Sequence, residues 1–493
     1  MVMMIRIINR FKAGKRIYLL LGLNCLMLCF FVNANAAISC TVNTHSFLTN
    51  TDTSVSSAIQ SQLAYHQQGL YYPQSVDRFY KQNGYKLAWI APDTVKTHAS
   101  EAMLLLDCVL QFGLNYADYH PKELTYEKLN LLTQKSDKQS NSEKAGFDMM
   151  LTDALITYIN HLHYGKLNPV FPAAKIDSGD INGFDASTIL TNALEQKNFD
   201  FMRVVLSVQP QSVAYKKLQY HLHVLTGLYT GDCYEIPGST VRKIAVNLER
   251  MRWISSDEKT YIEINIPSYS LKFQQPDTSC RFKVIVGKPG TPTPTLQSAI
   301  SYFTTAPEWK VPQSIFRKEI LPRALMDINY LANNHIAIYD ANGNYIEANK
   351  DMLLKVKENV EKYHARQSPG CGNSLGLIVF RFPNIYDIYL HDTPEQMLFK
   401  KQERAYSHGC IRVEHAGKLA DLLLKNDGAN SKITILHKAI SAYQHKRFIL
   451  KPPVSIKVTY FTCEVEKGIL ITYPDIYNLD KSLETALYNM EQP

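Results

Sequence analysis

The feature that most constrains this 493-residue chain is a change of hydrophobic periodicity near a loop rich in glycine and proline, at residues 231–238. Before the loop, apolar residues recur at the three- and four-residue spacing of an amphipathic helix, as between Leu151 and Leu162. After it, short β-branched runs such as Tyr261–Ile266 and Phe282–Val286 read as strands. The chain therefore consists of a helical region followed by a strand-rich region.

We expect an α+β architecture with an all-helical domain over residues 59–230 and a β-rich domain over residues 239–493. A leader rich in Ser, Thr and Asn, residues 37–58, precedes the first domain. A helical interlude at about 315–333 and 350–364 interrupts the strands of the second. Hydrophobic residues make up 45% of the chain and charged residues 20%, which is typical of folded proteins.

The first 36 residues have the order of a secretory signal peptide. Met1–Ala36 carries five basic residues and no acidic residue, and it contains the apolar run Ile17–Val32 before an Ala-Asn-Ala sequence that fits a cleavage site. A membrane-spanning helix needs about 20 apolar residues, so this run is short for one. We therefore expect export with cleavage after Ala36, and an uncleaved segment that tethers the protein to a membrane is the alternative.

The net charge of +8 does not indicate a nucleic-acid partner, because five of the 53 basic residues lie in the predicted signal peptide. The remaining 48 basic and 45 acidic residues leave only +3, which gives no electrostatic footprint for DNA or RNA. The sequence contains no Cys-x-x-Cys, His-Glu-x-x-His or phosphate-loop pattern. It therefore predicts no metal and no cofactor.

Cysteine usage leaves at least one thiol unpaired. Of nine cysteines, Cys25 and Cys29 lie in the predicted signal peptide, and the seven that remain cannot all pair in an oxidising compartment. Cys371 can pair with Cys280 or stay reduced, and the sequence leaves both open.

The most informative cysteine is Cys410, in the run Ser-His-Gly-Cys-Ile-Arg. A cysteine nucleophile reacts as the thiolate, which a free thiol forms only to a few per cent at about pH 7. His391 follows a predicted strand, and pairing of adjacent strands can bring it to Cys410 as a base. Gly409 permits a tight turn that aims the amides near Cys410 at a developing oxyanion. Arg412 supplies a fixed charge that can hold a carboxylate or orient the loop.

This run, with a preceding Tyr-Leu-His-Asp-Thr-Pro at Tyr389–Pro394, resembles the active-site signature of the L,D-transpeptidases, whose catalytic domain is of the YkuD type. Other segments resemble the large YcbB-type (LdtD-like) branch of that family, and the resemblance extends from about residue 60 to the end of the chain. These segments are Ala245–Trp253, Asn265–Ser270, Val286–Pro289, Trp309–Pro312, Pro369–Gly376, Val458–Thr462 and, in the helical part, Asp153–Tyr158 and Tyr164–Pro169.

The resemblance implies that Cys410 attacks the amide between the third residue and the terminal D-Ala of a peptidoglycan tetrapeptide stem. An amine of a second stem then captures the acyl group and forms a 3→3 cross-link. His391 matches the base of the family, and Gly409 and Cys410 match the residues whose amides bind the oxyanion. Ser407 and His408 are expected to shape the loop.

The resemblance also implies a substrate cleft. Tyr389 and Trp309 are expected to form its walls, Arg412 to contact substrate, and an insertion at about 310–373 to act as a helical lid. The implied partners are peptidoglycan stems as donor and acceptor, and the implied place is the periplasm, in cell-wall biogenesis and the maintenance of cell shape. Carbapenems are expected to acylate Cys410.

The chain departs from the YcbB-type branch in one respect. Members usually carry a small three-helix peptidoglycan-binding domain before the catalytic domain, and too few residues separate Leu228 from Ala245 to hold one. The sequence therefore leaves open which molecule accepts the acyl group. Water or a free D-amino acid would make the protein an L,D-carboxypeptidase or an exchange enzyme, and a lysine of an envelope protein would make it an anchoring enzyme. A non-catalytic wall-binding scaffold is the remaining alternative, against which the set His391, Cys410 and Arg412 argues.

Overall fold

The computed structural model describes residues 53–65, 69–90, 96–134, 140–179, 181–196, 200–227, 237–254 and 258–490. The predicted signal peptide and most of the predicted leader lie outside the described residues, as do Cys40 and Cys233. In the described part of the chain, no helix combines the length and the hydrophobicity needed to cross a membrane.

The first part of the described chain is helical, as predicted, and its centre is α7 (Asn141–His163). Ser140 and Glu143 form a capping box at its start, in which Ser140 Oγ accepts from the Glu143 amide at 3.2 Å and the Glu143 carboxylate accepts from the Ser140 amide at 3.0 Å. From Phe147 onward nearly every residue of α7 is buried, because helices α3, α4, α5, α9 and α10 pack around it. A helix that is covered on all sides explains why its apolar residues are not confined to one stripe.

The other helices of this part surround α7 or lead toward the strands. Asp185 and Asp200 start two of them, because each carboxylate accepts a hydrogen bond from the amide two residues on, at 2.8 and 2.9 Å. The helices are α3 (Thr53–Tyr65), α4 (Pro73–Gln82), α5 (Lys96–Asp107), α6 (Tyr126–Gln134), α8 (Ala173–Asp177), α9 (Ala186–Leu194), α10 (Phe201–Val208), α11 (Val213–Gly227) and α12 (Ser239–Arg252).

The second part is built on a mixed sheet of nine strands that closes on itself. The strand order is β11-β3-β12-β10-β9-β4-β13-β1-β2, and β2 also pairs with β3, so the two sides of the sheet meet. The strands are β1 (Tyr261–Asn265), β2 (Ser270–Gln274), β3 (Ser279–Gly287), β4 (Leu296–Thr305), β9 (Ile378–Arg381), β10 (Leu390–His391), β11 (Ala405–Ser407), β12 (Ile411–Val413) and β13 (Lys446–Thr459).

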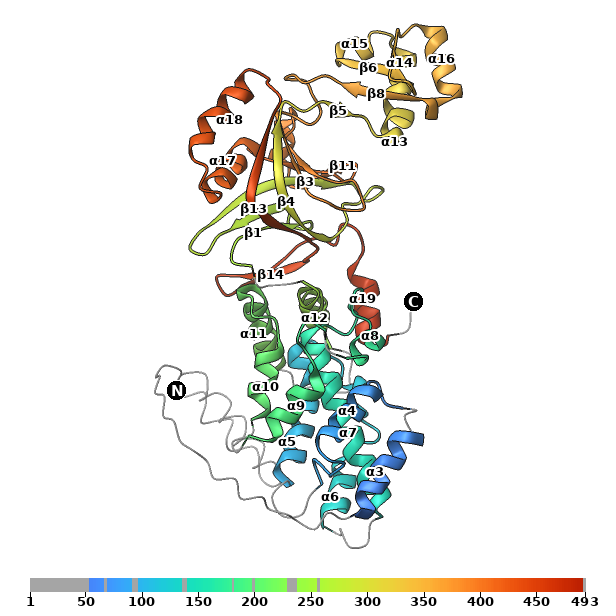
Figure 1. Ribbon diagram of the computed structural model, residues 1–493, viewed down its shortest axis with the longest axis vertical. Coiled ribbons are helices and arrows are strands. Elements are labelled where there is room, and N and C mark those ends of the chain that lie inside the picture. The colour runs from blue at the N-terminus through green and yellow to red at the C-terminus, as the bar shows by residue number, and fades with distance from the viewer. Residues whose placement is uncertain are drawn as a thin grey trace. The chain divides into compact units, whose positions relative to one another are not determined.

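One apolar core lies inside this closed sheet. Alternate residues of the strands enter it together with Leu419 and Leu423 of α17 (Ala416–Asn426) and Leu436 of α18 (Ser431–Ser441). Figure 1 shows α17 and α18 beside the long strands β4 and β13. Side chains that point away from this core, on the other face of each strand, are therefore available for contacts outside the closed sheet.

The segment Trp309–Gln367, between β4 and β9, is here called the insert. It was predicted as helical, and it does contain α13 (Gln313–Ile315), a π-helical turn (Phe316–Ile320), α14 (Leu321–Met326), α15 (Tyr330–Asn333) and α16 (Lys350–Glu358). Beside these helices lies a four-stranded sheet that the sequence did not reveal (Figure 1). Its strands, with two to five residues each, are too short for a periodicity to be recognised, and they are β5 (Trp309–Lys310), β6 (Ile336–Asp340), β7 (Tyr345–Ile346) and β8 (Tyr363–Gln367). The insert has its own core.

The C-terminal segment joins α12 to the strands. Asn247 of α12 donates to Thr462 Oγ1 at 2.9 Å and accepts from the Thr462 amide at 2.8 Å. The segment also contains the hairpin β14 (Cys463–Glu466) and β15 (Ile469–Thr472), and α19 (Asp480–Leu487). Cys280 and Cys371, for which the sequence left pairing open, are not bonded to each other.

Candidate active site

The register of two short strands places Cys410 and His391 on one face of the sheet. β10 runs parallel to β12, with Leu390 opposite Ile411 and His391 opposite Arg412. Leu390 and Ile411 enter the core, and side chains alternate between the two faces of a strand. The residues that share the other face are therefore Tyr389, His391, Cys410 and Arg412.

The loop before the nucleophile is held by two hydroxyl groups. Ser407 Oγ donates to the carbonyl oxygen of Cys410 at 2.5 Å and accepts from the amide of Gly409 at 3.1 Å. Thr293 Oγ1 donates to the carbonyl oxygen of Gly409 and accepts from the amide of Gly287, each at 2.8 Å. Gly409 has a φ of 116°, which favours glycine. Because its amide is bound to Ser407, the oxyanion role predicted for Gly409 requires this hydrogen bond to be shared or released.

The thiol of Cys410 is partly buried, and this burial raises its pKa above the ordinary value. Hydrogen bonds from the amide and hydroxyl of Tyr389 act in the opposite direction, as do the charges of Arg381 and Arg412, but burial dominates. The thiol therefore keeps its proton at neutral pH, and its reaction needs a base.

His391 has the properties of such a base. Burial lowers the pKa of His391 to about 3, the charge of Arg412 lowers it further, and the carbonyl groups of Asp392 and Leu375 oppose these effects. The ring is therefore neutral above that pH. Its Nδ1 lies 2.5 Å from the carbonyl oxygen of Asp392, so this nitrogen carries the hydrogen and Nε2 is left as the proton acceptor. Cys410 lies diagonally across the strand pair, a position that side chains on adjacent strands can bridge.

Two arginines flank these residues, and they differ in their contacts. Arg412 forms an ion pair with Glu395, downstream of His391. Arg381, at the end of β9, lies opposite Tyr389, and its guanidinium carbon is 4.8 Å from the centroid of the Tyr389 ring. Arg381 was not among the predicted site residues.

The insert contacts the same site at two points. The hydroxyl of Tyr389, whose pKa is raised by burial, accepts a hydrogen bond from the indole of Trp309. His408 Nε2 lies 2.5 Å from Glu319 Oε1 in the insert and 3.4 Å from Lys288 Nζ. His408 is thus directed toward the insert.

Comparisons with known proteins agree with this geometry. The Scaffold domain family matches residues 74–222, and the L,D-transpeptidase catalytic domain family, YkuD, matches residues 259–435, which include His391 and Cys410. Residues 259–435 are therefore similar to L,D-transpeptidase catalytic domains.

A relative from Haemophilus influenzae (strain Rd), provisionally named an L,D-transpeptidase, is 32% identical over 251 residues. The match covers 51% of this chain and 50% of the relative, so the chain spans about half the length of that protein. A solved structure described as an Ldtfm–avibactam carbamoyl enzyme is 13% identical and covers 41% of this chain and 49% of its own, with a TM-score of 0.19. This value is too low to support any argument.

Within the segment that matches the YkuD family, the predicted residues separate into two groups. Those gathered around the thiol are Trp309, Tyr389, His391, Cys410 and Arg412. Ser407, His408 and Gly409 instead form the loop and its contacts. The sequence did not predict a role for Thr293, Glu319, Arg381 or Glu395. A local signal existed only for Thr293, which lies in a Thr-Pro-Thr-Pro turn.

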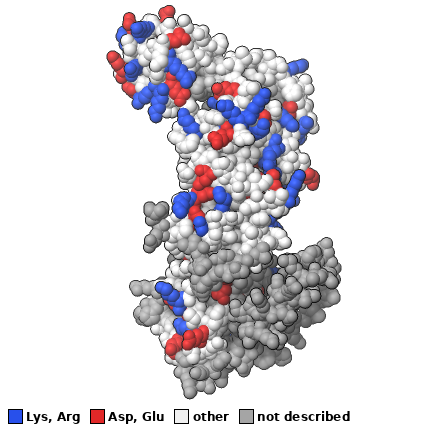
Figure 2. All heavy atoms as spheres, turned by 180° about the vertical axis from the view of Figure 1, so that it is seen from behind, with Lys and Arg blue, Asp and Glu red and all other residues white. Residues whose placement is uncertain are grey.

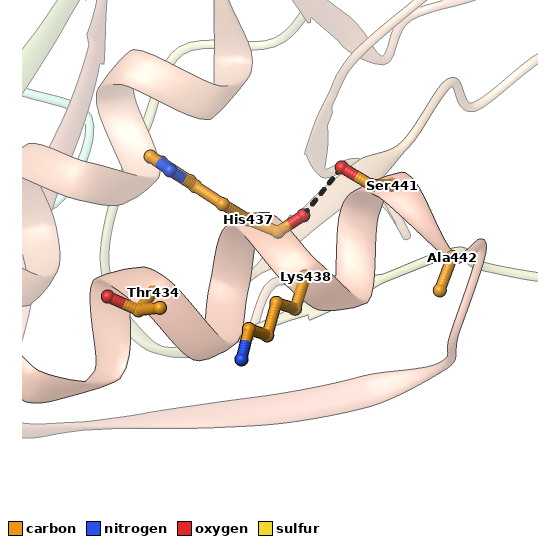
Figure 3. Close-up of a pocket in the computed structure, with 5 residues that line it drawn as sticks. All are labelled: Thr434, His437, Lys438, Ser441 and Ala442. Atoms are coloured by element: carbon orange, nitrogen blue, oxygen red, sulfur yellow. Dashed lines mark hydrogen bonds between the residues drawn. The ribbon is translucent and has the colours of Figure 1, made fainter.

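Away from this site, the described residues form a surface depression and no cluster suited to a metal ion. The described residues hold no group of three or more His, Cys, Asp or Glu arranged to bind a metal ion. A depression on α18 is lined by Thr434, His437, Lys438, Ser441 and Ala442 and shares no residue with the site (Figure 3). Basic and acidic side chains are interspersed on the described part of the face in Figure 2, in keeping with the near-neutral charge.

Proposed function

We propose that the chain is a peptidoglycan L,D-transpeptidase that acts in the periplasm and forms 3→3 cross-links through a thioester on Cys410. The observation that carries this proposal is the parallel register of β10 and β12, because it sets a neutral histidine diagonally across from a protonated thiol. The match of residues 259–435 to the L,D-transpeptidase catalytic domain agrees with it.

In the acylation half-reaction, His391 Nε2 takes the proton of the Cys410 thiol as the sulfur attacks the carbonyl carbon of the third stem residue. The C–N bond to the terminal D-Ala breaks, and the D-Ala nitrogen takes the proton from His391. A thioester and free D-Ala result. Because the thiol holds its proton more tightly than the imidazole would, proton transfer is expected to accompany the attack rather than precede it.

In the second half-reaction, the side-chain amine of another stem attacks the thioester carbonyl. A proton of the amine passes through His391 to the departing sulfur of Cys410, which restores the thiol. The new amide is the 3→3 cross-link, and the two half-reactions balance without an oxidant, a reductant or a cofactor.

The periplasm is proposed from the first 36 residues, which have the charge, apolar run and cleavage-site pattern of a signal peptide. Tetrapeptide stems are proposed as the substrates, because peptidoglycan lies in this compartment and L,D-transpeptidase domains act on its stems. An envelope protein is a second acceptor class that the same thioester would serve.

The test is incubation of the purified protein with disaccharide-tetrapeptide, followed by mass spectrometry. We expect a dimer that is lighter than two stems by one molecule of free D-Ala, and no product from Cys410→Ala. Cys371→Ala is the matched control, because it removes an exposed thiol that lies outside the site. This control should retain the activity of the unmodified protein.

Three other results would each contradict the proposal in a distinct way. Tripeptide alone would make the protein an L,D-carboxypeptidase, and tetrapeptide with an exchanged terminal residue would make it an exchange enzyme. Unchanged tetrapeptide would favour a protein acceptor or a non-catalytic scaffold.

A carbapenem provides an independent probe of the same thiol. Its strained amide should acylate Cys410 and add the mass of the drug to the protein. A Cys410→Ala protein that still gained this mass would show that the drug reacts elsewhere.

A further inference from the structure

A row of aromatic and arginine side chains crosses the sheet, starting at Cys410. Strands β12, β10, β9 and β4 are successive neighbours. Their registers place Tyr389 beside Cys410, Arg381 opposite Tyr389, and Tyr302 opposite Arg381. Side chains that are paired in register point to the same face of a sheet, so all four lie on the face of the nucleophile.

Arg381 reaches back along this row toward Cys410. Adjacent strands are about 4.8 Å apart, so two strand spacings, roughly 10 Å, separate the backbones of Arg381 and Cys410. The guanidinium carbon lies 4.8 Å from the centre of the Tyr389 ring, and the Tyr389 hydroxyl is hydrogen-bonded to the Cys410 thiol. The charge of Arg381 also lowers the pKa of that thiol.

The charge of Arg381 has no partner in the described part of the chain. Its neighbour Arg412 is held by Glu395, whereas no described carboxylate lies within ion-pair distance of Arg381. The Arg381 side chain is exposed. A guanidinium that stacks on a ring keeps its N–H groups free at the edge, in the fork geometry that matches a carboxylate.

We propose that Arg381 binds the free terminal carboxylate of the donor peptide, and that this contact selects a peptide ending one residue after the scissile bond. In the proposed function, on which this inference rests, the leaving residue is the terminal D-Ala. Its carboxylate carbon is three bonds from the scissile carbonyl carbon. With that carbonyl at the Cys410 sulfur, the carboxylate lies within one strand spacing, in the space above Tyr389 that Arg381 reaches.

The experiment compares two donor substrates, the tetrapeptide stem with its free carboxylate and the same stem with a terminal carboxamide. The unmodified protein should release the terminal residue of the acid with a kcat/KM roughly 10- to 100-fold above that of the amide, the range expected for a hydrogen bond to a charged group. Arg381→Gln should lower kcat/KM for the acid to nearly that for the amide and leave the amide little changed. Arg381→Lys should restore part of the preference.

Arg447→Gln is the matched control. Arg447 also stacks on a tyrosine, with its guanidinium carbon 3.8 Å from the Tyr302 ring, but it belongs to β13, on the far side of β4 from β9. Loss of its charge should leave the preference for the acid intact. A melting curve for each variant separates a lost contact from a lost fold.

The outcomes separate this inference from the proposed function. The role of Arg381 would be overturned if the unmodified protein turned over both substrates with equal kcat/KM. It would also be overturned if Arg381→Gln lowered kcat/KM equally for both. Either result would leave the transpeptidase proposal standing. Release of the terminal residue from neither substrate would overturn the proposed function and this inference with it.

Discussion

Thr293 Oγ1 donates a 2.8 Å hydrogen bond to the carbonyl oxygen of Gly409, the residue before the nucleophile. The same oxygen accepts the amide hydrogen of Gly287 at the end of β3. One buried hydroxyl thus fixes the nucleophile loop to the sheet, and the position of the Cys410 sulfur depends on it.

Thr293→Val should therefore slow acylation of Cys410. Valine keeps the shape of threonine but leaves the Gly287 amide and the Gly409 carbonyl without this partner, at a cost of about 1–3 kcal/mol. Part of this cost should appear as a roughly 10-fold or greater loss in the rate of the carbapenem reaction, measured by mass spectrometry. Thr434→Val, at an exposed position on α18, is the control. Equal acylation rates for the two variants would show that the loop keeps its position without Thr293.

The reaction of Cys410 with iodoacetamide should report a protonated thiol. Because burial raises its pKa above the ordinary value, the thiolate fraction, and with it the alkylation rate, should increase with pH through neutrality and beyond about pH 9. The rate is followed on the peptide that contains Cys410. A plateau reached below neutral pH would instead reveal a resting thiolate paired with a charged His391.

Buried neutral histidines should make the protein sensitive to acid. Burial lowers the pKa of both His161 and His391 to about 3, below the unfolded value of about 6.5. Between these values the unfolded chain binds more protons than the folded one. The stability that these groups contribute is complete above about pH 6.5 and is lost as the pH falls toward 3.

Urea midpoints measured at decreasing pH test this expectation. His161→Gln should flatten the acid limb, because it removes one group that the unfolded state would protonate. His445→Gln, at an exposed position, should leave the limb unchanged. Identical limbs for the two variants would mean that His161 does not contribute to the acid sensitivity.

The fold was predictable where patterns are long and local. The helical spacing of apolar residues in α7 and the β-branched runs after α12 were both visible in the sequence. The one-sided stripe expected of an amphipathic helix was wrong, because other helices cover α7 on all sides. The sheet of the insert was not predicted, because its strands are short and pair residues that are distant in the sequence, such as Trp309 with Gln367.

Only those residues of the candidate site that lie in or near one continuous segment could be predicted from the sequence. Cys410 and its neighbours were predicted as site residues from a run of six residues and a histidine upstream. Thr293 is 116 residues from Gly409, so the turn that contains it gives no sign of this contact. Arg381 reaches the site through the register of β9 with β10, and no local pattern marks it. Contacts that depend on register need the whole sheet to be known, since a shift by one residue would turn these side chains to the other face.

The contact between the insert and the nucleophile loop leads to a last prediction. Glu319 Oε1 accepts from His408 Nε2, and each side chain keeps about one third of its surface exposed, 33% in both cases. Partly exposed pairs of this kind contribute at most about 1 kcal/mol, so Glu319→Gln should raise KM for the stem by no more than about five-fold, with kcat little changed. Glu361→Gln is the control, because Glu361 contacts Arg317 at 3.9 Å with both side chains more than 60% exposed. If both variants keep the original KM, the insert does not help to hold substrate through His408.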